Sequence, residues 1–155
     1  MTAWITITKP TVGTGVSKDL FGDDVVDNLE RLHTLEDQSI WIPLNGATAL
    51  VTGDKAYWRV PAKFNGGLLV GVAAACKAGS SSGAVVLTVK NGSTAMLSAN
   101  ITLDQNETDT LTSSAPGTIN TAADDLATGN LLEISVISAG TGVTYCGVEI
   151  TVRPA

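Results

Sequence analysis

The chain has 155 residues and a mass of 15.9 kDa, which fits one compact domain with a short appendage. Hydrophobic residues make up 44% and charged residues only 15%, so the composition excludes a disordered chain. A formal net charge of −6 argues against nucleic acid and anionic membranes as partners. With a single His and two Cys, the sequence offers little material for catalysis, and we expect a protein without an active site, a cofactor or a bound metal.

Residues 1–39 predict a short strand, a turn and one amphipathic helix. Residues 3–9 alternate with the period of a β-strand, and Pro10 ends that run. Ser17 has the character of a helix N-cap. Beyond it, apolar residues recur at spacings of four and three, which places them on one stripe of a helix: Phe21, Val25, Leu29, Leu32 and Leu35. A lone helix of this length is marginal in water, so we expect the stripe to pack on its own domain or on a partner.

Residues 40–155 predict a β domain. Short β-type runs alternate with Gly-, Asn- and Asp-rich turns, and no helical period separates them. This pattern predicts a mainly β, antiparallel sandwich, and eight or nine strands favour a jelly roll over an immunoglobulin-like sandwich. The predicted strands are 40–42, 48–51, 56–60, 67–77, 84–90, 94–103, 107–113, 131–138 and 144–153.

Two groups of side chains are candidates for binding. Residues 104–109 crowd oxygen donors as a calcium loop does, but the positions of the loop glycine and the bidentate Glu hold Asp109 and Ala115, so a polar hairpin tip is the better interpretation. Trp41, Tyr57 and Trp58 could stack on sugar rings. Because neighbouring strand residues point to opposite faces, Tyr57 and Trp58 cannot line one platform, and we expect at least one of them to pack in the core.

The two cysteines, Cys76 and Cys146, are predicted to be free thiols. The N-terminus lacks the basic start and the long apolar run of a signal peptide, so we expect synthesis in a reducing cytoplasm. In that compartment both side chains serve as small buried hydrophobic groups.

The chain resembles a recurrent type of tailed-bacteriophage virion accessory protein. One part of the resemblance is a Trp-containing segment before a helix, with Trp4, Pro10, Gly13, Val16-Ser17, Leu20, Asp27-Asn28-Leu29 and Leu32. The other part is the run Tyr57-Trp58-Arg59-Val60-Pro61 with Phe64-Asn65-Gly66-Gly67, which looks like the early strands of such jelly rolls.

The resemblance implies a non-enzymatic virion structural protein, a capsid decoration or cement protein on the virion surface. It also implies a homotrimer whose partner is the major capsid protein or another virion protein. We expect the partner contact at Trp4, Phe21, Val25, Leu29 and Leu32. The alternative is a tail-fibre or receptor-binding tip that recognises host glycans through residues 79–83, 104–106 and 140–142. An enzyme such as a depolymerase is the least favoured interpretation, because no pair of carboxylates stands out.

Overall fold

The computed structural model describes residues 36–155. The predicted N-terminal strand and amphipathic helix lie outside the described residues. The same holds for all five predicted contact residues, which are Trp4, Phe21, Val25, Leu29 and Leu32.

The described chain is mainly β. Its elements, in order, are β1 (Gln38–Pro43), β2 (Lys55–Arg59), the 3-10 turn η1 (Ala62–Phe64), β3 (Leu68–Ala75), β4 (Val85–Asn91), β5 (Thr94–Ala95), β6 (Leu97–Ala99), β7 (Ile101–Leu103), β8 (Thr118–Ile119), β9 (Leu131–Ala139) and β10 (Gly147–Arg153).

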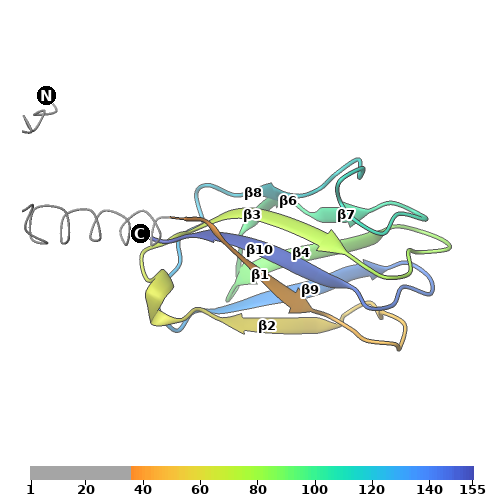
Figure 1. Cartoon of the computed structure of the whole chain (residues 1–155), viewed down its shortest axis with the longest axis horizontal. Helices are drawn as coiled ribbons and strands as arrows, with labels where there is room; N and C mark the ends of the chain where they lie inside the picture. The colour runs from red at the N-terminus through yellow and green to blue at the C-terminus, as the bar shows by residue number, and fades with distance from the viewer. Residues whose placement is uncertain (1–35) are drawn as a thin grey trace, which may run out of the picture. The chain divides into compact units, whose positions relative to one another are not determined.

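These strands form an antiparallel β-sandwich (Figure 1). One sheet has the order β1-β10-β3, and the other has the order β2-β9-β4, with β5 and β7 both pairing with β4. The short strands β6 and β8 pair with each other. The sequence prediction of a mainly β, antiparallel sandwich is confirmed at this level.

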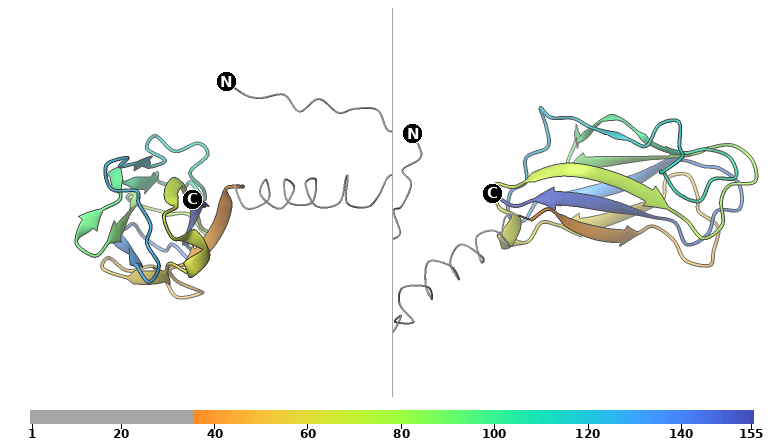
Figure 2. Two further views of the ribbon diagram at one scale, coloured as in Figure 1. Left: turned by 90° about the vertical axis from the view of Figure 1, so that its left-hand side faces the viewer. Right: turned by 45° about the horizontal axis from the view of Figure 1, so that its top comes forward.

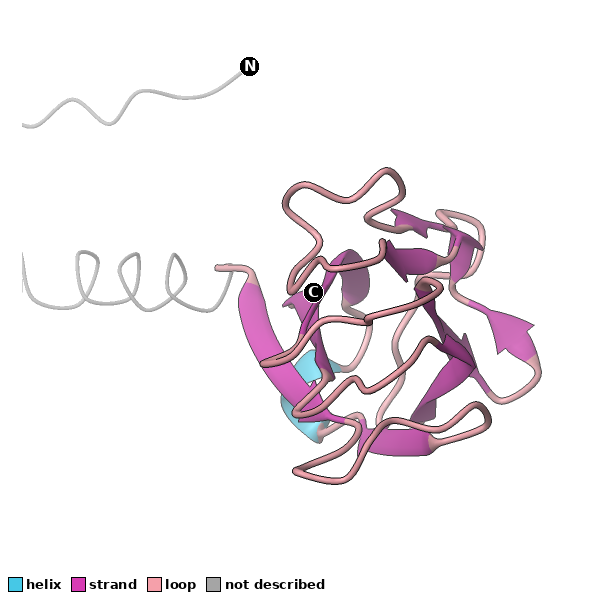
Figure 3. Cartoon of the chain, turned by 90° about the vertical axis from the view of Figure 1, so that its right-hand side faces the viewer, coloured by secondary structure: helices cyan, strands magenta, loops and turns pink. Residues whose placement is uncertain are grey.

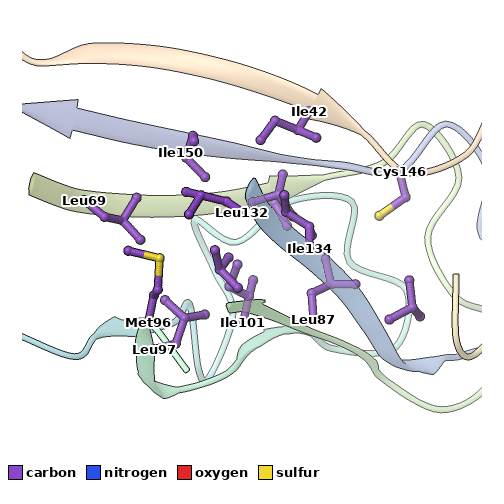
Figure 4. Close-up of a cluster of buried hydrophobic side chains, with 14 of the residues drawn as sticks. Ile42, Leu69, Leu87, Met96, Leu97, Ile101, Leu132, Ile134, Cys146 and Ile150 are labelled. Carbon is purple, nitrogen blue, oxygen red and sulfur yellow. The ribbon is translucent and has the colours of Figure 1, made fainter. Parts of the chain in front are cut away.

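The inner faces of the two sheets supply the hydrophobic core. Leu132 and Ile134 on β9 are fully buried, and so is Ile150 on β10 (Figure 4). Val148, also on β10, is fully buried as well. Burying one such side chain contributes about 1.5–3 kcal/mol relative to leaving it exposed. The alternation of apolar residues therefore fixes which face of each strand turns inward.

Two of the predicted strands are wrong. Residues 48–51 form a loop, where the buried Leu50 donates its backbone N–H to Val143 O at 2.8 Å. Residues 107–113 also form a loop, in which Asp109 Oδ1 accepts the N–H of Leu111 at 2.8 Å. Short acidic side chains that bond nearby backbone groups compete in this way with a strand ladder.

Two further strand predictions need correction in their extent. The predicted strand 94–103 is divided into β5, β6 and β7, because its parts pair with different neighbours. The predicted strand 144–153 begins only at Gly147, because Tyr145 has a left-handed backbone with φ of 52°.

The sandwich of residues 36–155 has two distinct ends. β1 begins where β10 finishes, since Gln38 pairs with Val152, and Arg153 holds Asp37 there through bonds of 2.8 and 2.9 Å. We call this the terminal end. The 3-10 turn η1 lies at the same end (Figure 2, left). Lys63 of η1 donates from Nζ to Gln38 Oε1 at 2.8 Å. The opposite end, seen face-on in Figure 3, carries the loops 44–54, 76–84, 104–109 and 140–146, and we call it the loop end.

Candidate functional site

Three loops at the loop end are joined by hydrogen bonds. Ser81 N–H donates to Thr141 O at 3.0 Å, and Gln105 Nε2 donates to Ser81 O at 2.8 Å. Asn106 N–H also donates to Ser80 O at 2.8 Å. The structure thus brings together the segments 79–83, 104–106 and 140–142 that the sequence suggested for glycan recognition.

The buried Ser80 organises this junction. Its Oγ accepts the N–H of Thr141 at 2.9 Å and donates to Ser82 O at 2.8 Å. Gly140 lies against it with φ of 59°, and a Cβ at that position would fall 2.3 Å from Ser80 Oγ. Only glycine fits both the backbone and the space, so a side chain at position 140 would disrupt this junction.

The acidic side chains of residues 104–109 hold their own loop. Asp104 Oδ2 accepts the N–H of Ser114 at 3.0 Å, and this bond lowers the pKa of Asp104 below its usual value. Glu107 accepts from the N–H of Asp104 and from the hydroxyl of Thr112. These bonds agree with the polar character expected of the segment, but it is not a hairpin tip, because β7 before it pairs with β4 and β8 after it pairs with β6. Within residues 36–155, no three His, Cys, Asp or Glu side chains are grouped as a metal site would need.

Tyr145 is an exposed aromatic residue at the loop end that the sequence analysis missed. Its ring is half exposed, its N–H donates to Gly46 O at 2.8 Å, and Lys77 Nζ lies 5.3 Å from the ring centre. A non-glycine residue with positive φ costs of order 1 kcal/mol, and such residues cluster at functional sites. The exposed position of Tyr145 could not be predicted, because the pattern of residues 144–153 is typical of one continuous strand.

Trp41 is also half exposed, on the outer face of the β1-β10-β3 sheet. Its indole lies over Gly147, where a Cβ would come within 2.4 Å of the ring. The neighbouring outward positions on β3 are small, namely Gly71, Ala73 and Ala75. About half of Trp41 stays accessible to solvent, so its sugar-stacking role remains a prediction.

Tyr57 and Trp58 point to opposite faces of β2, as predicted. Tyr57 is 54% exposed, whereas Trp58 packs on the core with its ring 5.8 Å from that of Phe64. Trp58 is thereby excluded from a sugar platform, and Tyr57 remains as a surface aromatic on the outer face of the β2-β9-β4 sheet.

Both cysteines are free and buried. Burial raises the pKa of the Cys146 thiol to about 12, and the nearby Cys76 adds to the shift. Burial likewise raises the pKa of Cys76, helped by Asp109. Both groups are therefore neutral and unreactive near pH 7, which fits the predicted role as small hydrophobic residues.

No protein-family model, no curated protein and no solved structure matches this chain. Among residues 36–155, no helix is long and apolar enough to cross a membrane.

Proposed function

We propose that the protein is a non-enzymatic structural protein of a tailed-phage virion that decorates the capsid surface. The observation that carries this proposal is the separation of the two ends of residues 36–155. The chain enters the sandwich at the terminal end, which the Asp37–Arg153 ion pair closes, and the organised loops occupy the opposite end. A domain attached through its N-terminal segment would present these loops away from the shell.

We further propose that the sandwich is a jelly roll. Such a fold is a long antiparallel hairpin wrapped into two sheets, so its strands pair in nested order. The pairs β1 with β10, β2 with β9, and β4 with β7 fit this order. The remaining pair would join β3 to residues 118–125, and Leu69 N–H donates to Asp124 O at 2.9 Å in support.

Attachment to the shell is assigned to the N-terminal segment. Its partner would be the major capsid protein or another virion protein, contacted through Trp4, Phe21, Val25, Leu29 and Leu32. The apolar stripe needs a surface to cover it, and a shell subunit offers one.

A double substitution tests this attachment. We expect Leu29→Asp with Leu32→Asp to keep the β-type circular dichroism spectrum and to lose binding to particles that lack the native protein, because two carboxylates would be desolvated in the contact. Asp19→Ala with Asp23→Ala is a control that leaves the apolar stripe intact. Full particle binding by the Leu29/Leu32 variant would refute attachment through the stripe, and loss of the β spectrum would assign the stripe to the domain's own core.

Recognition of a host glycan by the loop end is the second candidate function. It is favoured by the hydrogen-bonded junction of three loops and by the exposed Tyr145 beside them. Copy number on the particle separates the two functions, since a decoration protein is present in hundreds of copies and a fibre tip in tens or fewer. Binding to host cells that is abolished by Tyr145→Ala would support the second candidate.

A further inference from the structure

The outer face of the β2-β9-β4 sheet combines an exposed aromatic ring with positive charge. Tyr57, Glu133 and Lys90 lie side by side in register across the three strands. Lys55 and Arg59 flank Tyr57 on β2, two residues to either side, and therefore point to the same outer face. This face is not part of the loop end.

Both carboxylate oxygens of Glu133 accept hydrogen bonds from neighbouring side chains. Its Oε2 accepts from Lys55 Nζ at 2.9 Å and from the Tyr57 hydroxyl at 3.2 Å, while its Oε1 accepts from Ser135 Oγ at 2.5 Å. These bonds lower the pKa of Glu133, chiefly through Ser135 and then Lys55. The carboxylate therefore stays charged, neutralises one cation and holds the Tyr57 ring in place.

Two cations of the face remain without a carboxylate. Within residues 36–155, the ion pairs are Lys55–Glu133 and Asp37–Arg153, so neither Arg59 nor Lys90 has an acidic partner there. A patch with surplus positive charge stands out on a chain whose net charge is −6. Between these cations lies Leu131, half exposed beside Arg59 in register.

We infer that this face binds an acidic polysaccharide, a chain of sugars with carboxylates at intervals. Arg59 supplies a planar fork that suits a carboxylate, Lys90 supplies a second positive charge, and the Tyr57 ring offers a flat surface for a sugar ring.

Local charge and surface chemistry favour this ligand. The net charge of −6 opposes any polyanion at long range, but at about 0.15 M salt the Debye length is about 8 Å, so contact binding depends on the local surplus of three cations over one carboxylate on this face. A stable protein partner would need a continuous apolar centre, whereas on β9 the exposed Leu131 and Ile137 are separated by Glu133 and Ser135. The inference depends on neither shell attachment nor loop-end recognition.

The experiment measures binding of the full chain to oligomers of polygalacturonic acid by calorimetry, with neutral dextran oligomers as the comparison. We expect binding to the uronate oligomers alone, weaker at higher salt, and reduced about tenfold or more by Arg59→Gln with Lys90→Gln. Tyr57→Phe keeps the ring and should bind nearly as the native chain does, whereas Tyr57→Ala should bind more weakly.

Matched controls locate the site. Lys63→Gln removes a cation at the terminal end, and Tyr145→Ala removes the loop-end aromatic; both should bind the uronate oligomers as the native chain does. The inference is overturned if the native chain does not bind the uronate, if dextran binds equally, or if the Arg59/Lys90 variant retains full affinity. Preference for a DNA oligonucleotide, or self-association that the same variant abolishes, would also overturn it.

Discussion

At the residue scale, close packing makes single glycines decisive. Gly147 on β10 lies beneath the Trp41 indole, and an added Cβ would lie 2.4 Å from the ring and 2.8 Å from Ile42 O. Gly46 in the nearby loop has nothing within 4 Å of its virtual Cβ. The two positions form a matched pair, because the same added methyl group meets a ring in one case and open space in the other.

We expect Gly147→Ala to destabilise the protein by about 1–3 kcal/mol through overpacking, and Gly46→Ala to change stability by less than about 0.5 kcal/mol. Urea unfolding followed by tryptophan fluorescence measures both free energies. Equal stability of the two variants would show that the Trp41 contact is not close-packed in solution.

The raised pKa of Cys146 also predicts how stability and thiol reactivity depend on pH. The folded state holds the thiol proton more tightly than the unfolded chain, whose thiol has a pKa near 9.0. Stability from this group is therefore complete below pH 9 and is lost as the pH rises from 9 toward 12. We expect native protein at pH 8 to resist alkylation without reductant, and unfolded protein to take up two labels by intact mass. Failure of the unfolded chain to react would indicate a disulfide.

At the element scale, β9 is an interior strand of its sheet, between β2 and β4, and shows how alternation fixes orientation. Leu131 is 51% exposed and its neighbour Leu132 is fully buried, although both are leucines on the same strand. The difference comes from the pleat, which sends successive side chains to opposite faces.

We expect Leu132→Ala to cost about 2–5 kcal/mol and Leu131→Ala to cost less than about 0.5 kcal/mol in urea unfolding. The comparison holds residue type and strand constant. A similar loss for both variants would mean that the outer face is covered in solution, for example by another copy.

At the scale of the whole molecule, the proposed virion role predicts a symmetric homotrimer. Apolar side chains remain exposed on both sheets and on the loops, including Trp41, Ile137 and Leu111, and side-by-side sandwiches could cover some of them. Light scattering of the purified full chain should give three times the 15.9 kDa chain mass. A monomer in solution, with no threefold contacts on particles, would contradict the trimer.

Much of the candidate site could be predicted as separate pieces. The Gly, Ser and Asn content of residues 79–83, 104–106 and 140–142 predicts loops, and strand alternation predicts that Tyr57 and Trp58 point to opposite faces. Which of these loops contact one another in the folded protein could not be predicted. The bonds of Ser81 to Thr141 and of Gln105 to Ser81 join residues far apart in the chain, and local propensity carries no information about them.

The sequence by itself determined the β class, the opposite orientations of Tyr57 and Trp58 and the turn at Asn91-Gly92 that joins β4 to β5, because alternation and turn chemistry are local properties. Only the tertiary structure decided that residues 48–51 and 107–113 are loops, that Tyr145 takes a left-handed backbone, and that Arg59 and Lys90 share a face with Glu133. The reason is that strand pairing and surface charge arise from contacts between distant segments, which exist only once the two sheets have closed on their common core.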